Sequence, residues 1–139
     1  MFRHERRTDK EILAVKIHES AENYLEAILM LKNKSGYVRA IDIAHHLSFT
    51  KASVSVALKS LREGGYITVD ETDGNISLTD GGTAIAEKIY ERHTVIARLL
   101  MAMGVSEQTA YEDSCKIEHD ISSESFDKLK RYMIKNDIL

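Results

Sequence analysis

The most restrictive feature of this sequence is a change of hydrophobic period after residue 65. Residues 66–69 and 75–78 have the pattern of short strands, and the Asp73-Gly74 pair between them is a strong signal for a β-hairpin. Most of the remaining chain has helical spacing, and it contains no proline. The sequence therefore predicts a mainly α-helical protein with one small β-hairpin.

Two short helices are expected directly before the hairpin. Residues 39–47 have apolar side chains at helical spacing, a three-residue turn follows, and Thr50 is a good N-cap for a helix over 51–63. A Gly-Gly pair ends that helix. Helix, turn, helix and hairpin in this order describe a winged helix-turn-helix, whose second helix enters the major groove of DNA. The apolar positions expected to be buried on the second helix are Val54, Leu58 and Leu61.

The exposed face of this second helix is suited to DNA. Short polar side chains near its beginning are able to reach base edges or phosphates, and nearby cations are able to hold the DNA backbone. The formal net charge of −3 does not support DNA binding, and the acidic tip of the hairpin should add little affinity. Each residue alone fits an ordinary exposed helix face, but the arrangement as a unit favours DNA. The expected contacts are Arg39, Thr50, Lys51, Ser53, Ser55, Lys59 and Arg62.

Helical patterns fill the rest of the chain. Capping residues and terminal glycines mark where these helices begin and end. The expected segments are a short helix from Thr8, a helix capped by Ser20 that ends near Gly36, and helices over 80–103, 107–120 and 123–135.

A second group of residues has the chemistry of a metal site. Cys115, Glu118 and His119 stand at i, i+3 and i+4, so one helix would present a thiolate, a carboxylate and an imidazole on the same face. Together these donors suit a late first-row divalent ion. Spacing alone leaves a second interpretation open, because carboxylates are common and a lone cysteine is usually a small buried hydrophobe.

Several motifs extend this picture along the chain. The sequence has AENYLE at 21–26, DIAHHL at 42–47, SVS at 53–55, LTDGG at 78–82, RH at 92–93 and CKIEH at 115–119. With these motifs, residues 20 to about 134 resemble the diphtheria-toxin-repressor family of iron- and manganese-dependent regulators, especially its short manganese-regulator branch. CKIEH is the most specific match, because the family has Cys or Glu, two residues and then Glu-His at this place.

The resemblance implies a set of metal ligands. Cys115 occupies a position that is Cys in the iron branch and Glu in the manganese branch. Asn23 stands where the manganese regulators have Asp and the iron regulators have Met. The ancillary metal site of the iron branch looks lost, because its positions here are Ala97 and Tyr111. The implied ligands are Asn23, Glu26, His93, Cys115, Glu118 and His119.

The resemblance also implies an organisation and a function. Residues 1–17 would be an extension, 18–80 a winged helix-turn-helix DNA-binding domain, and 81–139 a helical metal-binding and dimerisation domain. The protein would be a homodimeric repressor that binds double-stranded operator DNA when Fe²⁺ or Mn²⁺ is bound, with Co²⁺ or Zn²⁺ possible in vitro. Apolar residues of the last domain fit either a dimer contact or a core: Val95, Leu99, Leu100, Phe126 and Leu129.

Two other functions fit parts of the sequence. A winged-helix regulator could sense oxidation through Cys115, or an organic effector, in place of a metal. A metal-dependent hydrolase would need an open coordination position and a base beside a substrate cleft, and no nucleophile motif supports it. We therefore expect a regulator and not an enzyme.

Composition bears on the cellular compartment. The single cysteine excludes an internal disulfide and suits a reducing compartment. No apolar run reaches the roughly 18 residues of a membrane span, and the first ten residues lack the apolar core of a secretion signal. The sequence predicts a cytoplasmic protein with no membrane partner.

Overall fold

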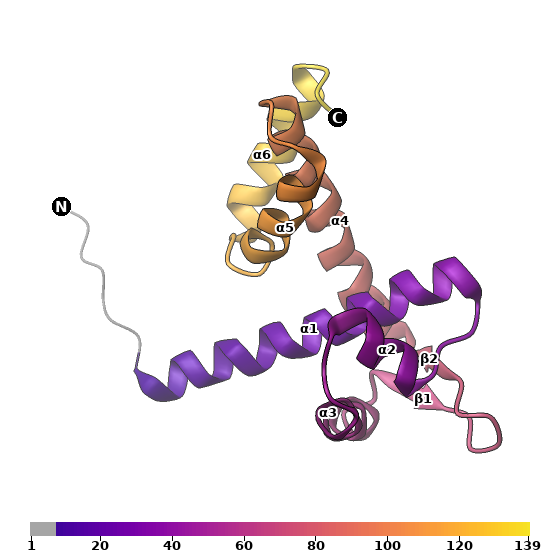
Figure 1. Ribbon diagram of the computed structural model, residues 1–139. Coiled ribbons are helices and arrows are strands. Elements are labelled where there is room, and N and C mark those ends of the chain that lie inside the picture. The colour runs from indigo at the N-terminus through magenta and orange to yellow at the C-terminus, as the bar shows by residue number, and fades with distance from the viewer. Residues whose placement is uncertain (1–7) are drawn as a thin grey trace. The chain divides into compact units, whose positions relative to one another are not determined.

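The computed structural model describes residues 8–139, with residues 11–17 described by their backbone only. Within these residues the chain forms helices and one two-stranded antiparallel hairpin, which confirms the expected fold class (Figure 1). Residues 1–7 of the expected extension lie outside the described part. The elements are α1 (Asp9–Ser35), α2 (Ala40–Leu47), α3 (Lys51–Glu63), β1 (Ile67–Val69), β2 (Ile76–Leu78), α4 (Asp80–Ala102), α5 (Glu107–Ile117) and α6 (Ser123–Lys135).

The beginning of the chain differs from the sequence-based expectation. The prediction of a short helix followed by one capped at Ser20 is wrong, because α1 is a single helix of 27 residues. A cap forms only where the backbone leaves the helix, and this stretch contains no glycine or proline that would break it. The helix ends where expected, at Gly36, which has φ +74° and donates its N–H to the Lys32 carbonyl at 2.8 Å.

The described residues divide into two compact units, a first one that ends at Ile85 and a second one of Ala86–Leu139. In the first unit, α2 and α3 are joined by a tight turn in which Ser48 has φ +57°. Thr50 caps α3 as predicted, because its side chain accepts the N–H of Ser53 at 3.2 Å. Val54, Leu58 and Leu61 are buried, which confirms the predicted inner face of α3.

The hairpin follows α3 directly, as the change of period predicts. Ile67 pairs with Leu78 and Val69 pairs with Ile76 across the two strands. Gly74 has φ +75° in the connection, a conformation that glycine adopts without a steric penalty. The side chains of Ile67 and Ile76 are buried, so one face of the hairpin belongs to the core of the first unit.

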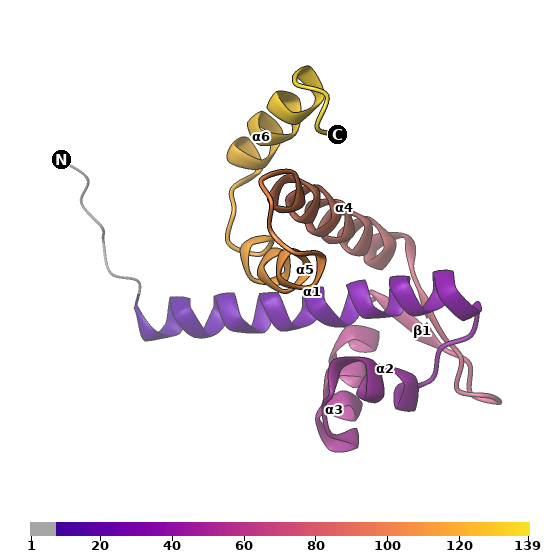
Figure 2. The ribbon, with the colours of Figure 1, turned by 45° about the horizontal axis from the view of Figure 1, so that its top comes forward.

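The second unit contains most of α4 together with α5 and α6 (Figure 2). Its core is built from Val95 and Ile96 of α4 and from Phe126 and Met133 of α6. Val95 and Phe126, two of the residues that fitted either a core or a dimer contact, are therefore core residues. The other three residues of that set are partly buried and pack against this core: Leu99, Leu100 and Leu129.

Helix α5 is shorter than expected. It ends at Ile117 rather than near Asp120, and Glu118 is its C-cap residue. The guanidinium of the buried Arg92 donates to the Glu118 carbonyl at 3.1 Å and to the Ile121 carbonyl at 2.7 Å. These carbonyls thereby gain partners outside the helix, which favours a turn at this point.

None of the helices in the described part of the chain combines the length and the apolar character that a membrane span needs.

Candidate functional site

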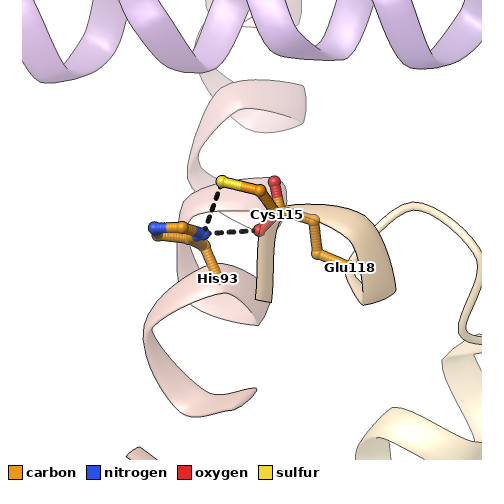
Figure 3. Close-up of side chains that lie close together, drawn as sticks. All are labelled: His93, Cys115 and Glu118. Carbon is orange, nitrogen blue, oxygen red and sulfur yellow. Dashed lines mark hydrogen bonds and ion pairs between the residues drawn. The ribbon is translucent and has the colours of Figure 1, made fainter. Parts of the chain in front are cut away.

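Three potential metal ligands meet between α4 and α5 in the second unit. His93 comes from the middle of α4, Cys115 from the last turn of α5, and Glu118 from its C-cap (Figure 3). The Nδ1 atom of His93 lies 2.8 Å from Oε2 of Glu118 and 3.5 Å from Sγ of Cys115. One ligand atom from each residue lies within 4.8 Å of the other two. Among the described residues, no other three histidine, cysteine or acidic side chains come together in this way.

The electrostatics of this cluster favour a positive charge. Glu118 is fully buried and His93 is 7% exposed. Burial alone would lower the pKa of His93, but its contacts with Cys115 and Glu118 outweigh this and raise the pKa to about 10. Oε1 of Glu118 has no hydrogen-bond partner among the described atoms and lies 3.4 Å from Nε2 of His119. A buried carboxylate with an unfilled acceptor beside an imidazole and a thiol is suited to a cation.

The geometry fits a divalent metal ion. Ligand atoms about 2.0–2.3 Å from a common ion are separated by about 3–4.5 Å. The three ligand atoms of this cluster all lie within 4.8 Å of one another, so small side-chain movements would bring them to these separations. Nitrogen, sulfur and oxygen donors together suit iron, cobalt or zinc, and less so manganese. Coordination requires a neutral imidazole and a thiolate, so metal binding would release protons from this site.

Two further residues support the cluster, and ligand spacing did not point to either. Ser114 is fully buried, its hydroxyl donates to the His93 carbonyl, and its Oγ lies 3.3 Å from Nδ1 of His93. Arg92 belongs to the RH motif, in which the sequence indicates a role only for His93. The contacts of Arg92 with the carbonyls of Glu118 and Ile121 hold the segment that carries the Glu118 carboxylate.

The remaining predicted ligands are placed differently. The interpretation of Cys115, Glu118 and His119 on one helix is only partly right, because α5 ends before Glu118 and His119 lies in the following turn. Glu118 keeps helical dihedral angles, which preserves its position relative to Cys115. Asn23 and Glu26 lie on α1 in the first unit, where Glu26 is buried and Asn23 is half-buried.

The residues predicted to contact DNA all belong to the helix-turn-helix. Thr50 is the N-cap of α3 and Arg39 is the N-cap of α2. Arg62 makes an exposed ion pair of 3.4 Å with Glu71 of the hairpin connection. The other predicted contacts lie exposed on α3: Lys51, Ser53, Ser55 and Lys59.

The hairpin is attached to the helix-turn-helix by the segment that joins α1 to α2. The Tyr37 hydroxyl donates to the Asp73 carbonyl at 2.8 Å and accepts from Nε of Arg39 at 2.8 Å. The Val38 carbonyl accepts the N–H of Ile76 at 2.8 Å, so this segment lies along β2. The wing is thereby held against the end of α1 and the start of α2, and sequence reasoning did not find this attachment.

Fold and site together define a class of protein. The first unit is a winged helix-turn-helix with an exposed polar recognition helix. The second unit is helical and carries a cluster of nitrogen, sulfur and oxygen donors. Together these are the parts of a metal-dependent DNA-binding regulator. Comparison with known families gives the same result. Residues 16–74 match the model of the iron-dependent repressor N-terminal DNA-binding domain, and residues 79–136 match that of the iron-dependent repressor metal-binding and dimerisation domain. The chain belongs to the iron-dependent repressor family.

Several relatives support this assignment. An uncharacterized HTH-type transcriptional regulator of Methanocaldococcus jannaschii is 34% identical over 119 residues, which are 84% of this chain and 94% of the relative. The HTH-type transcriptional regulator MntR of Lysinibacillus sphaericus is 33% identical over 110 residues, or 79% of this chain and 78% of the relative. The family and these relatives are transcriptional regulators, so the chain is a DNA-binding regulator and not an enzyme.

Solved structures share the fold. A hypothetical protein of Sulfolobus solfataricus has a TM-score of 0.61 and 31% identity, with 82% of this chain and 87% of that chain covered. The manganese regulator SloR has a TM-score of 0.72 at 24% identity, with 81% of this chain and 53% of that chain covered, which shows the fold alone. The chain therefore spans about half the length of the SloR chain.

Proposed function

We propose that this chain is a cytoplasmic repressor that controls metal-ion homeostasis and binds a pseudo-palindromic operator as a homodimer when iron(II) or manganese(II) is present. The observation that carries the proposal is the convergence of His93, Cys115 and Glu118 in a chain whose other unit is a winged helix-turn-helix. In this proposal, residues 18–80 bind DNA and residues 81–139 bind the metal and dimerise.

The proposed ligands differ in how directly the structure supports them. His93 through Nδ1, Cys115 through Sγ and Glu118 through its carboxylate form the core of the site. His119 joins them on the strength of its family position and its 3.4 Å separation from Glu118. Glu26 and Asn23 stay predictions. A bound divalent ion supplies the positive charge that compensates the buried carboxylate and the thiolate.

We infer that iron(II) activates DNA binding at least as well as manganese(II). The thiolate of Cys115 is a soft ligand and Asn23 is neutral, and both features disfavour the hard manganese ion relative to iron(II) or cobalt(II). Affinity should rise along the Irving–Williams order, so zinc would bind tightly in vitro without being the physiological signal.

The experiment that tests the function combines metal analysis with DNA binding. The purified protein should contain a divalent metal, enrich specific duplexes from a random-sequence pool, and lose them when a strong chelator is added. A ligand activates binding only if its affinity for the DNA-competent state is higher, so DNA should in turn raise the metal affinity. Retention of DNA affinity in chelator, with loss on oxidation of Cys115, would instead support a thiol sensor.

Matched variants separate the metal from the fold. Glu118→Gln removes the buried carboxylate charge, whereas Glu112→Gln makes the same change at an exposed position of α5. Only the first should abolish metal-activated DNA binding.

Lys51→Ala and Arg62→Ala should weaken DNA binding and make its salt dependence shallower, because each removes a phosphate contact. A protein that is monomeric at operator-binding concentrations would contradict the proposed homodimer.

A further inference from the structure

We propose that Val56 and Ala52 on α3 select thymine by packing against its methyl group in the major groove. The inference deepens the proposed function and rests on it, because it requires that α3 is the helix that enters the groove. Neither residue was among the DNA contacts predicted from the sequence.

The position of Val56 carries the inference. Its side chain is 72% exposed, the largest exposed fraction among the exposed large hydrophobic residues of the described chain. It stands two residues from the buried Val54 and two from the buried Leu58, and two residues correspond to about 200° around a helix. Val56 therefore points directly away from the core of the unit. Ala52 is exposed one turn earlier, on the same face.

A valine at this position has no evident value for the free protein. Branching at Cβ lowers helix propensity, and a side chain exposed to this extent gains little from packing. The polar neighbours on α3 match the charge of DNA, because Lys51 precedes Ala52 and Lys59 follows Val56 by three residues. Val56 and Ala52 form an apolar strip, flanked by cations, on the outer face of the recognition helix. Such a strip fits the major groove, where one base carries an apolar group.

That group is the C5-methyl of thymine. The other base edges in the major groove present hydrogen-bond donors and acceptors, which Val56 and Ala52 are unable to pair. These two side chains are able to distinguish bases only by apolar contact. The proposal therefore predicts a thymine in each half-site opposite Val56 or Ala52, and it leaves the polar base contacts to Lys51, Ser53 and Ser55.

The test uses uracil, which differs from thymine only by the missing methyl group. Duplexes enriched from a random pool by the full chain with manganese(II) provide the probe, and each thymine of one half-site is replaced in turn by uracil. We expect about a fourfold loss of affinity at one or two positions, the effect of removing one buried methyl group. Val56→Ala should narrow the difference between the thymine and uracil forms at one of these positions, because the alanine side chain is shorter and buries less of the methyl group. Since Val56 is exposed and alanine favours helix, this variant should fold normally.

Lys59→Ala serves as the matched control on the same helix. It should weaken binding to the thymine and uracil duplexes by the same factor, because a phosphate contact carries no base information. Equal affinity of the wild type for all uracil duplexes would overturn the inference while DNA binding itself stands. Methyl dependence that persists unchanged in Val56→Ala would equally overturn the role of this residue. A chain that enriches no duplex would overturn the proposed function as well.

Discussion

The two adjacent glycines at the start of α4 should respond in opposite ways to alanine. A Cβ atom on Gly82 would lie 2.1 Å from the carbonyl oxygen of Tyr66 and 3.4 Å from Cδ2 of Leu78. The same Tyr66 carbonyl accepts the N–H of Thr79 at 3.0 Å, so its position is constrained. A Cβ atom on Gly81 would have Thr79 Oγ1 as its nearest neighbour, at 3.9 Å, and Gly81 is exposed.

The geometry allows an estimate of the two effects. The Gly82 contact must open by about 1 Å, and overpacking of this kind costs about 1–3 kcal/mol of unfolding free energy. The higher helix propensity of alanine offsets about 0.5–1 kcal/mol of that cost. At Gly81 only the favourable part applies. We therefore expect Gly81→Ala to be about 2 kcal/mol more stable than Gly82→Ala.

Denaturant unfolding of the two metal-free variants, measured side by side, gives this difference directly. Because Tyr66 immediately precedes β1, the Gly82→Ala variant should also bind enriched duplexes more weakly, whereas Gly81→Ala should bind them normally. The reasoning is refuted if Gly82→Ala is as stable as Gly81→Ala, since the close approach of backbone to Gly82 would then be absent.

Four other predictions follow from the site and the wing. Metal should raise the melting temperature of the wild type much more than that of His119→Ala, and equal stabilisation would remove His119 from the site. The double change Cys115→Glu with Asn23→Asp should shift activation from iron(II) toward manganese(II), as anaerobic titrations of DNA binding would show; unchanged preference would contradict the assignment. Tyr37→Phe should cost about 1 kcal/mol of unfolding free energy and loosen the wing, so amide hydrogen exchange in the hairpin should become faster. Unchanged exchange would show that the tyrosine attachment is dispensable. Because the pKa of His93 is raised to about 10 in the folded protein, its stabilising contribution without metal is complete below about pH 6.5 and is lost as the pH rises toward 10. Unfolding measured across this range should show the decline in the wild type and a smaller one in His93→Asn.

The elements found from sequence were those whose signals lie within a few residues. Thr50 accepts the N–H of Ser53 three positions away, and Gly74 takes its positive φ inside the hairpin connection. Gly36 ends α1 by a bond to Lys32, four residues earlier. Such interactions depend only on neighbouring residues, so residue type and spacing were enough to predict these boundaries.

The errors came where a local signal competed with its surroundings. Ser20 has the chemistry of a cap, but α1 continues through it because nothing interrupts the helix. The end of α5 was misplaced because Arg92, 26 residues before Glu118, takes up the carbonyl of that residue. No pattern inside the segment that follows Cys115 carries this information.

The sequence by itself determined the donor types of the proposed metal site, because Cys115 and Glu118 are close along one helical turn. Only the tertiary structure brought Nδ1 of His93, 25 residues from Glu118, to 2.8 Å from its carboxylate. The same holds for Val56, whose place opposite the core follows from helical spacing but whose 72% exposure depends on what else packs around α3. Local contacts are encoded by neighbouring residues, whereas burial and long-range contacts are set by how the helices pack on one another.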